Sequence, residues 1–198
     1  MKRKVVFATG NAGKMKEIRE ILKDLDCEVC SMKEMGIDIP IEENGKTFEE
    51  NAVIKAEAVA AVCGEIVLAD DSGLEIDYLN GEPGIYSARY MGEDTPYSIK
   101  NANLIERLKG VPEDLRGARF VCVIAAVFPD GEVVSTYGEV KGRIAHSERG
   151  SNGFGYDPVF FLPEFGRTTA ELSDHEKNSI SHRGEALRKM KEELRKRF

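Results

Sequence analysis

The chain has 198 residues, of which 41% are hydrophobic and 32% are charged, a length and composition typical of one globular domain. Asp and Glu total 35 against 28 Lys and Arg, which gives a net charge of −7. This acidic balance disfavours binding to a nucleic-acid polymer or an anionic membrane, because both need a basic surface. No apolar run reaches the roughly 20 residues that cross a bilayer, and residues 5–8 are too few for a signal-peptide core. We therefore expect a single domain over residues 1–198, located in the cytoplasm.

The N-terminal region begins with a predicted buried strand at residues 5–8, and apolar residues at helical spacing follow it from Met15 to Leu25. A glycine-containing junction, residues 9–14, joins the two elements. Cys27 and Cys30 have a spacing seen in redox and metal sites, but a structural zinc site usually needs a second pair of ligands. We favour a half-buried strand with reduced thiols.

The next predicted elements are a helix and a second buried strand. Thr47-Phe48-Glu49-Glu50 has the form of a capping box, so a helix should run from there to about Cys63, where Gly64 ends it. Residues 66–69 form the expected strand. It should end in the polar segment 70–73.

The C-terminal half is predicted to contain two helices and a hairpin. Thr95-Pro96 resembles a helix start, and residues 120–128 form an apolar strand that Asp130-Gly131 turns back into a strand at 133–140. A closing helix should span residues 184–197. Strands that alternate with helices, plus one hairpin, predict an α/β fold with a central twisted mixed sheet flanked by helices.

The junction at residues 9–14 has the parts of a phosphate-binding loop, since it combines two glycines, a hydroxyl, an amide and a lysine at a helix N-terminus. It is not a Walker A loop, because that motif needs glycine and Ser/Thr where this chain has Ala8 and Met15. Lys14 lies at the positive end of the helix dipole, which is unfavourable unless an anion is near. The alternative is a plain strand-to-helix turn with a solvated lysine.

Two acidic pairs could hold a metal ion, Glu42-Glu43 and Asp70-Asp71. The loop lacks the hydroxyl that holds magnesium in P-loop enzymes, so carboxylates would have to supply the ligands. Successive residues of a strand point to opposite faces, so only one of Asp70 and Asp71 should face a given site. Adjacent aspartates at a buried strand end are costly unless a cation compensates them. An acidic turn that caps the next segment is the alternative.

Two later segments carry groups suited to a flat, polar ligand. Residues 153–157 place glycines on both sides of Phe154, which would let a planar ring approach the aromatic face; a turn that anchors aromatics in the core fits the pattern equally well. Lys177 and Ser181-His182-Arg183 offer cationic donors for carbonyl or phosphate oxygens. A solvated surface is the alternative interpretation of that cluster.

Together and in this order, the segments resemble the inosine triphosphate pyrophosphatase family, the non-canonical purine nucleoside triphosphate pyrophosphatases. Each segment is short, and their order makes the resemblance specific. The match extends over nearly the whole chain. The segments that carry it are 9–14, 42–52, 69–74, 83–90, 153–158 and 181–183.

The resemblance implies hydrolysis of ITP, dITP and XTP to the monophosphate and pyrophosphate, with Mg²⁺, by a homodimer whose subunits have two lobes and a substrate cleft between them. By position, it implies that Asp71 is the general base and that Glu42 and Asp71 hold the metal. The choice between Glu42 and Glu43, and any part played by Asp70, stay open. The residues that it assigns to the nucleotide are Thr9, Gly10, Asn11, Ala12, Gly13, Lys14, Ser72, Phe154, Gly155, Tyr156, Asp157, Lys177, His182 and Arg183.

Specificity can be argued from the bases. Hypoxanthine and xanthine carry an acceptor oxygen at position 6, which Lys177 or Arg183 could engage, whereas adenine presents a donor that would leave these cations unpaired. Two other functions remain as alternatives: a non-catalytic nucleotide-binding sensor, and a pyrophosphatase for other modified nucleotides.

Overall fold

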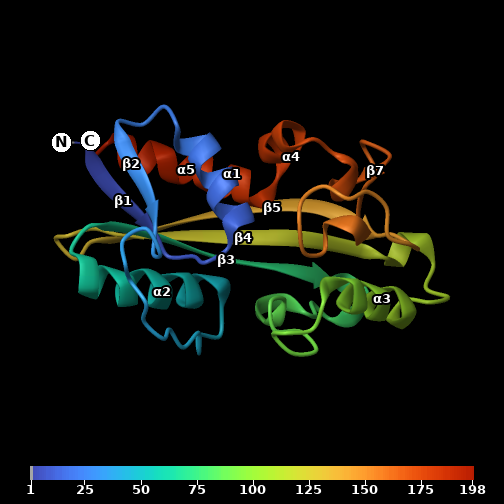
Figure 1. Cartoon of the computed structure of the whole chain (residues 1–198). Coiled ribbons are helices and arrows are strands. Elements are labelled where there is room, and N and C mark those ends of the chain that lie inside the picture. The colour runs from blue at the N-terminus through green and yellow to red at the C-terminus, as the bar shows by residue number, and fades with distance from the viewer. Residues whose placement is uncertain (1) are drawn as a thin grey trace. The chain divides into compact units, whose positions relative to one another are not determined.

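The computed structural model describes residues 2–198 and is an α/β fold built on one mixed sheet (Figure 1). Seven strands pair in the order β2-β1-β3-β4-β5-β6-β7. β1 is parallel to both β2 and β3, whereas β6 is antiparallel to β5 and β7. The strands are β1 (Arg3–Phe7), β2 (Cys27–Ser31), β3 (Ile66–Ile76), β4 (Gly117–Val127), β5 (Val133–Ile144), β6 (Phe160–Leu162) and β7 (Arg167–Thr168). The helices are α1 (Ala12–Leu22), α2 (Phe48–Cys63), α3 (Tyr97–Arg107), α4 (Asp174–Ile180) and α5 (His182–Arg195).

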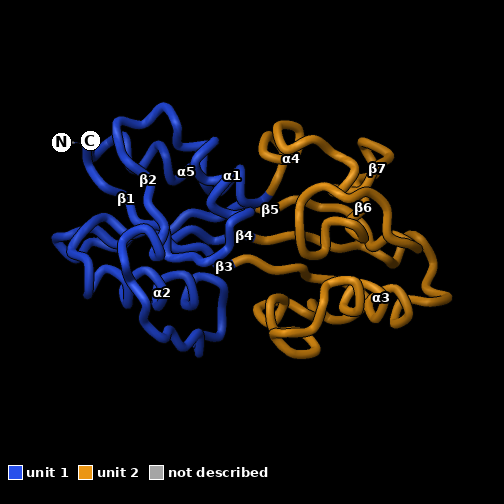
Figure 2. The backbone as a smooth tube through the Cα atoms, viewed as in Figure 1, with its two compact units in different colours: residues 1–71, 122–138, 182–198 blue, residues 72–121, 139–181 orange. Residues whose placement is uncertain are grey.

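The chain divides into two compact units (Figure 2). Unit 1 contains the described residues through Asp71, together with 122–138 and 182–198. Unit 2 contains residues 72–121 and 139–181. β3, β4 and β5 each contribute residues to both units. The predicted mixed sheet with flanking helices is confirmed, whereas the single-domain boundaries and the substrate cleft stay predictions.

In unit 1, α1 and α5 cover one side of the strands and α2 covers the other (Figure 1). The core joins apolar side chains of these strands to the buried faces of α1 and α5, because both helices repeat apolar residues at the spacing of one helical face. The fully buried members include Val5, Phe7, Ile18, Leu68, Ile124, Leu187 and Met190. This packing places the C-terminal end of β1 and the start of α1 beside β3.

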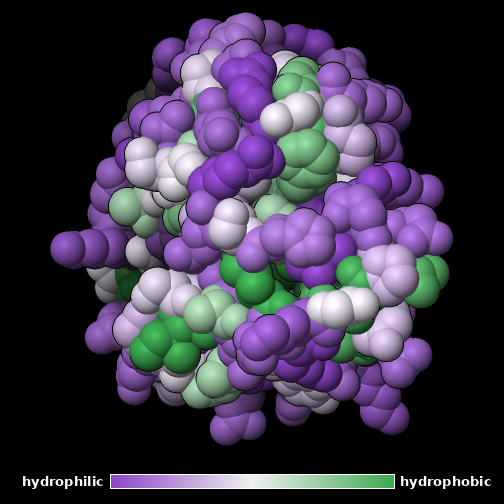
Figure 3. All heavy atoms as spheres, turned by 90° about the vertical axis from the view of Figure 1, so that its right-hand side faces the viewer, coloured by the Kyte–Doolittle hydropathy of each residue, from purple (hydrophilic) through white to green (hydrophobic). Residues whose placement is uncertain are grey.

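In unit 2, α3 and α4 lie on opposite sides of the strands (Figure 1). Its core contains Leu74, Leu104 and Phe160, and the Phe120 and Phe160 rings lie 4.2 Å apart. The surface view toward this end of the molecule shows apolar patches interrupted by hydrophilic residues (Figure 3).

Helix α2 begins and ends where the sequence predicts. The Thr47 side chain accepts a hydrogen bond from the Glu50 N–H at 3.1 Å. Glu50 completes the N-terminus differently from a capping box, because its carboxylate accepts from the Lys46 N–H. Gly64 ends the helix with φ of 65°, a left-handed conformation that glycine adopts without steric penalty.

Three sequence predictions need correction or adjustment. The strand expected to end at residue 69 continues through residues 70–73 to Ile76, in a sheet in which it lies next to β4. The N-cap of α3 is Pro96, without a side-chain cap, whereas the Thr95 hydroxyl donates to the Met91 carbonyl. The closing helix starts two residues early, at His182.

The predicted half-buried strand around Cys27 and Cys30 is confirmed as β2, and all four cysteines, which lie in the described part of the chain, are free thiols. No helix within residues 2–198 is both long and apolar enough to span a membrane.

Candidate active site

The predicted phosphate loop, residues 9–14, joins β1 to α1 in unit 1. Asn11 is the N-cap of α1, and its Oδ1 accepts a hydrogen bond from the Lys14 N–H at 3.0 Å. The Asn11 N–H donates to the Thr9 hydroxyl at 3.1 Å. In α1, all of which the structure describes, the first turn has no acidic side chain. The positive end of this helix is therefore open to an external anion.

Asp70 lies between two cations of unit 1. Its carboxylate accepts from Lys14 Nζ at 2.8 and 3.0 Å and from Arg183 Nε at 3.4 Å. Burial opposes ionisation of Asp70, but the charges of Lys14, Arg183 and Lys55 outweigh burial and hold its pKa well below the ordinary value. Arg183 also donates to Glu17 at 2.6 Å. The cations that the sequence assigns to a polyanion are thus organised around one buried acid.

Asp71 is in different surroundings. Lys55 Nζ lies 3.8 Å from Asp71 Oδ1 and 3.0 Å from Glu43 Oε2. Burial raises the pKa of Asp71 to about 6, and the nearby Glu43 and Asp70 charges also raise it, against the opposing influence of Lys55 and Asn51. The cations in direct contact with Asp70 and Asp71 therefore differ, as expected for successive residues of a strand, although the charge of Lys55 acts on both.

Lys55 and Asn51 were not predicted as site residues. They are four residues apart on α2, so one helix face presents both. The Asn51 Oδ1 accepts from the Gly45 N–H at 2.8 Å, and the Asn51 side chain lowers the pKa of Asp71. The i, i+4 spacing of an amide and a lysine in an alanine-rich helix was the available signal.

The two acidic residues of the 42–45 segment, Glu42 and Glu43, have different surroundings. Glu43 is partly buried and joined to Lys55, whereas Glu42 is exposed. The carboxylate that shares a cation with Asp71 is therefore that of Glu43, and the metal-binding role of Glu42 stays a prediction.

The carboxylates of Glu43 and Asp71 fit a magnesium site by their chemistry. Mg²⁺ prefers oxygen ligands and is usually bound by one or two carboxylates together with substrate phosphates, rather than by a cage of protein ligands. Among residues 2–198, no group of three or more His, Cys, Asp and Glu side chains is arranged to hold a metal. Glu43 and Asp71 are two such carboxylates, and both approach the same ammonium group, that of Lys55.

The glycine–aromatic loop, residues 153–157, is in unit 2. Gly153 and Gly155 have φ of +75° and +69°, and a Cβ on Gly153 would lie 2.1 Å from Asp157 Oδ2. This carboxylate accepts from the Phe154 N–H at 2.9 Å and, through Oδ1, from the Thr169 hydroxyl at 2.8 Å. Glycine at 153 is therefore required by space as well as by φ.

Lys177 contacts the same loop. It is buried, its Nζ is 2.7 Å from Asp157 Oδ2, and it lies 4.7 Å from the centre of the Phe154 ring. The sequence did not predict this contact of Lys177 with the aromatic segment. His182 and Arg183, expected beside it, are buried in unit 1 at the start of α5.

The predicted residues therefore fall into two groups. Those in unit 1 are Thr9, Gly10, Asn11, Ala12, Gly13, Lys14, Glu42, Asp71, His182 and Arg183; those in unit 2 are Ser72, Phe154, Gly155, Tyr156, Asp157 and Lys177. Their assignment to substrate and metal stays a prediction.

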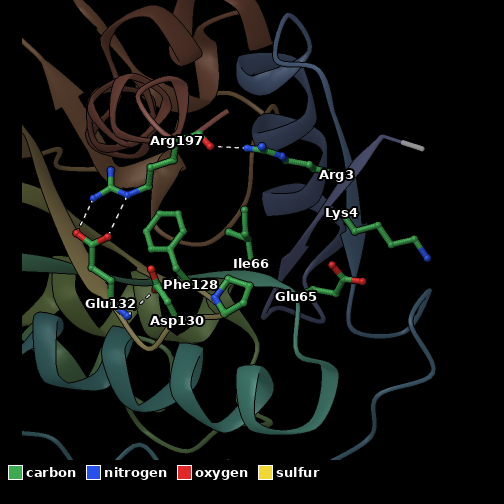
Figure 4. Close-up of a pocket in the computed structure, with 9 residues that line it drawn as sticks. Arg3, Lys4, Glu65, Ile66, Phe128, Asp130, Glu132 and Arg197 are labelled. Carbon is green, nitrogen blue, oxygen red and sulfur yellow. Dashed lines mark hydrogen bonds and ion pairs between the residues drawn. The ribbon is translucent and has the colours of Figure 1, made fainter.

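A hollow of about 450 Å³ lies elsewhere in unit 1 (Figure 4). Arg197 and Glu132, which both line it, form an ion pair, with the guanidinium 4.6 Å from the centre of the Phe128 ring. Its lining residues include both acids and bases but none of the predicted site residues.

Comparison with known proteins relates the chain to one family over its length. The model of the Ham1 family matches residues 5–193. A dITP/XTP pyrophosphatase of Clostridium perfringens is 52% identical over 98% of both chains, and one of Bacillus subtilis is 47% identical over 95% of both.

Solved structures agree with these sequence relatives. The Ham1 protein of Staphylococcus aureus has a TM-score of 0.88 at 42% identity, covering 99% of this chain and 100% of that one. A HAM1 protein from Coxiella burnetii has a TM-score of 0.89 at 41% identity, covering 98% and 99%. The fold, the order of the motifs and the sequence similarity agree over nearly the whole chain. The chain therefore belongs to the Ham1 family.

Proposed function

We propose that this protein hydrolyses non-canonical purine nucleoside triphosphates, namely ITP, dITP and XTP, to the monophosphate and pyrophosphate. The observation that carries the proposal is the acidic pair of β3, in which Asp70 holds two cations and Asp71 has a raised pKa beside Lys55. Relatives about half identical over the full length are dITP/XTP pyrophosphatases. Such an activity removes deaminated purines from the nucleotide pool, and we expect it in the cytoplasm.

The phosphate half of the reaction belongs to unit 1. The open N-terminus of α1 and the Lys14 ammonium supply donors for the triphosphate. Lys14 has three N–H donors and Asp70 uses part of that capacity, so phosphate oxygens can be bound without removing the internal ion pair. These local cations suit a small polyanion in a chain with a net charge of −7.

Asp71 is the proposed general base. With a pKa of about 6, it is largely ionised at neutral pH yet basic enough to take a proton from water at the α-phosphorus. Lys55 keeps this carboxylate beside a fixed positive charge. Mg²⁺ held by Asp71 and Glu43, or Glu42 as the resemblance implies, would neutralise charge on the phosphates.

The base is proposed to bind unit 2, at the 153–157 loop and Lys177. The Phe154 ring offers a stacking face, and stacking of a base on an aromatic contributes roughly 1 to 3 kcal/mol. A 6-oxo group can accept a further hydrogen bond from the Lys177 ammonium, which also donates to Asp157, whereas the 6-amino group of adenine offers this donor no acceptor.

The test is a substrate panel. Purified protein with Mg²⁺ is incubated with ITP, dITP, XTP, ATP, GTP and CTP, and pyrophosphate and orthophosphate are measured separately. We expect pyrophosphate from the first three substrates. Orthophosphate release, or equal rates on ATP and ITP, would contradict the proposal; tight binding of ITP without turnover would instead indicate a sensor.

A homodimer is proposed as the assembly. The motif order described above carries this proposal, because the family that it resembles implies a homodimer. Light scattering on a sizing column measures the mass, and a monomer at micromolar concentration would argue against it.

A further inference from the structure

Helix α3 holds the glycine–aromatic loop through one buried amide. The Asn101 side chain is 1% exposed. Its Nδ2 donates to the Gly155 carbonyl at 3.4 Å and to Glu148 Oε1 at 2.8 Å. All three residues belong to unit 2.

The orientation of this amide is determined by its partners. A carbonyl and a carboxylate can only accept, so the NH₂ group of Asn101 must face Gly155 and Glu148. Its Oδ1 is buried and finds no hydrogen-bond partner in the part of the chain that the structure describes. A buried, unpaired carbonyl costs free energy that an apolar side chain would avoid. What this position provides is therefore the N–H donor.

Two further side chains of α3 make buried contacts in unit 2, one with the loop and one with residue 88. The Tyr97 ring packs edge-on against Tyr156, with centroids 5.1 Å apart. Lys100 is fully buried and donates to the Ala88 carbonyl at 2.6 Å. The helix thus contacts the loop at two successive residues, Gly155 and Tyr156.

The Gly155 carbonyl needs such an external donor. Gly155 has a positive φ, a region that glycine enters and leaves freely, so its own conformational preference does not fix the peptide. The Asp157 carboxylate fixes the other side of Phe154 through that residue's N–H. With both anchors present, the backbone on each side of the Phe154 ring is held.

We infer that Asn101 is a positioning residue for base recognition, acting through the Gly155 carbonyl on the orientation of Phe154. This inference rests on the proposed function, in which residues 153–157 bind the purine. Asn101 itself touches no substrate. Its removal should weaken recognition of the base while leaving the phosphate chemistry of unit 1 intact.

The experiment compares Asn101→Ala with Asn103→Ala. Asn103 is the same residue type two positions further along α3, and its Oδ1 accepts from the Tyr90 hydroxyl at 2.7 Å instead of contacting the loop. Hydrogen–deuterium exchange of peptides covering residues 153–157 is measured on the nucleotide-free proteins, with β4 peptides as the reference for global stability. Steady-state kinetics on ITP and ATP give KM, kcat and the preference between the two bases.

The expected result is faster exchange at residues 153–157 in Asn101→Ala alone, with unchanged exchange in β4. The KM for ITP should rise about three- to tenfold, the effect of one hydrogen bond, with a smaller change in kcat and a reduced preference for ITP over ATP. Should Asn101→Ala fold poorly, Asn101→Leu keeps nearly the same shape and removes the donor without placing a second carboxylate beside Glu148, and the same rise in KM is expected.

Exchange in the loop equal to that of Asn103→Ala would overturn the inference whatever the activity. So would faster exchange with wild-type KM and preference, or an equal loss on ITP and ATP. A wild-type enzyme with no preference for ITP would refute the proposed function, and the exchange data would still decide whether Asn101 holds the loop.

Discussion

Replacing Asp71 with asparagine should make the nucleotide-free protein more stable at neutral pH and nearly abolish turnover. The folded protein raises the pKa of Asp71 from 3.8 to about 6, so the ionised carboxylate is less favourable in the folded state than in the unfolded one. A rise of about two units corresponds to about 3 kcal/mol, at about 1.4 kcal/mol per unit. Asparagine lacks the charge and avoids that penalty.

The stability difference between Asp71→Asn and the wild type should depend on pH. The stabilising effect of protonated Asp71 is fully present below about pH 4 and is lost as the pH rises through about 6. The advantage of Asp71→Asn should therefore be close to zero at pH 4 and approach about 3 kcal/mol at pH 7.5.

Urea unfolding followed by circular dichroism, with EDTA present, measures this difference at both pH values. Asp130→Asn is the control: Asp130 is exposed and accepts a hydrogen bond from the Glu132 N–H, an acceptor that asparagine keeps, so little change is expected. In parallel, kcat on ITP should fall by a factor on the order of 100 or more in Asp71→Asn. An Asp71→Asn protein no more stable than wild type at pH 7.5, or equally stabilised at both pH values, would refute this account of the carboxylate.

Three other substitutions test separate parts of the structure. Lys55→Met removes the cation that lowers the pKa of Asp71, so the acidic limb of the kcat/KM profile should move to higher pH; an unmoved limb would remove Lys55 from the site. Gly153→Ala places a Cβ 2.1 Å from Asp157 Oδ2, and we expect the ITP KM to rise at least tenfold with a smaller loss on ATP, as measured by initial rates; normal kinetics would mean that the loop tolerates displacement. Gly64→Ala puts a side chain at φ of 65° and should lower the free energy of unfolding by about 1 kcal/mol, while kcat stays at the wild-type value. Urea unfolding measures this loss, and an unchanged free energy of unfolding would contradict the assignment of this C-cap.

Local signals explain which parts of the structure could be predicted from the sequence. The N-cap at Thr47 and the left-handed Gly64 act within a few residues of the helix ends that they determine, so the bounds of α2 could be predicted. The length of β3 could not, because a strand continues where a neighbouring strand pairs with it, and the neighbour β4 is far away in the chain.

The same distinction applies to the candidate site. The phosphate loop is one contiguous segment with a recognisable composition, and its N-cap is as expected. Lys55 had only a weak signal, its i, i+4 spacing from Asn51, since a lysine in the middle of an alanine-rich helix is usually solvated. Its contacts with Glu43 and Asp71 arise only when α2 packs beside β3, and the choice of Glu43 over Glu42 depends on the same packing.

The buried carboxylate of Asp70 also bears on how a reaction cycle would end. An enzyme that binds a leaving polyanion through lysine and arginine without a counter-ion would release the product slowly. Its departure would leave uncompensated positive charge in a low-dielectric interior. Here Lys14 and Arg183 already share an internal counter-ion, so the emptied protein returns to a paired state. Product inhibition by inorganic pyrophosphate should accordingly be weak, and a neutral residue in place of Asp70 should make it strong.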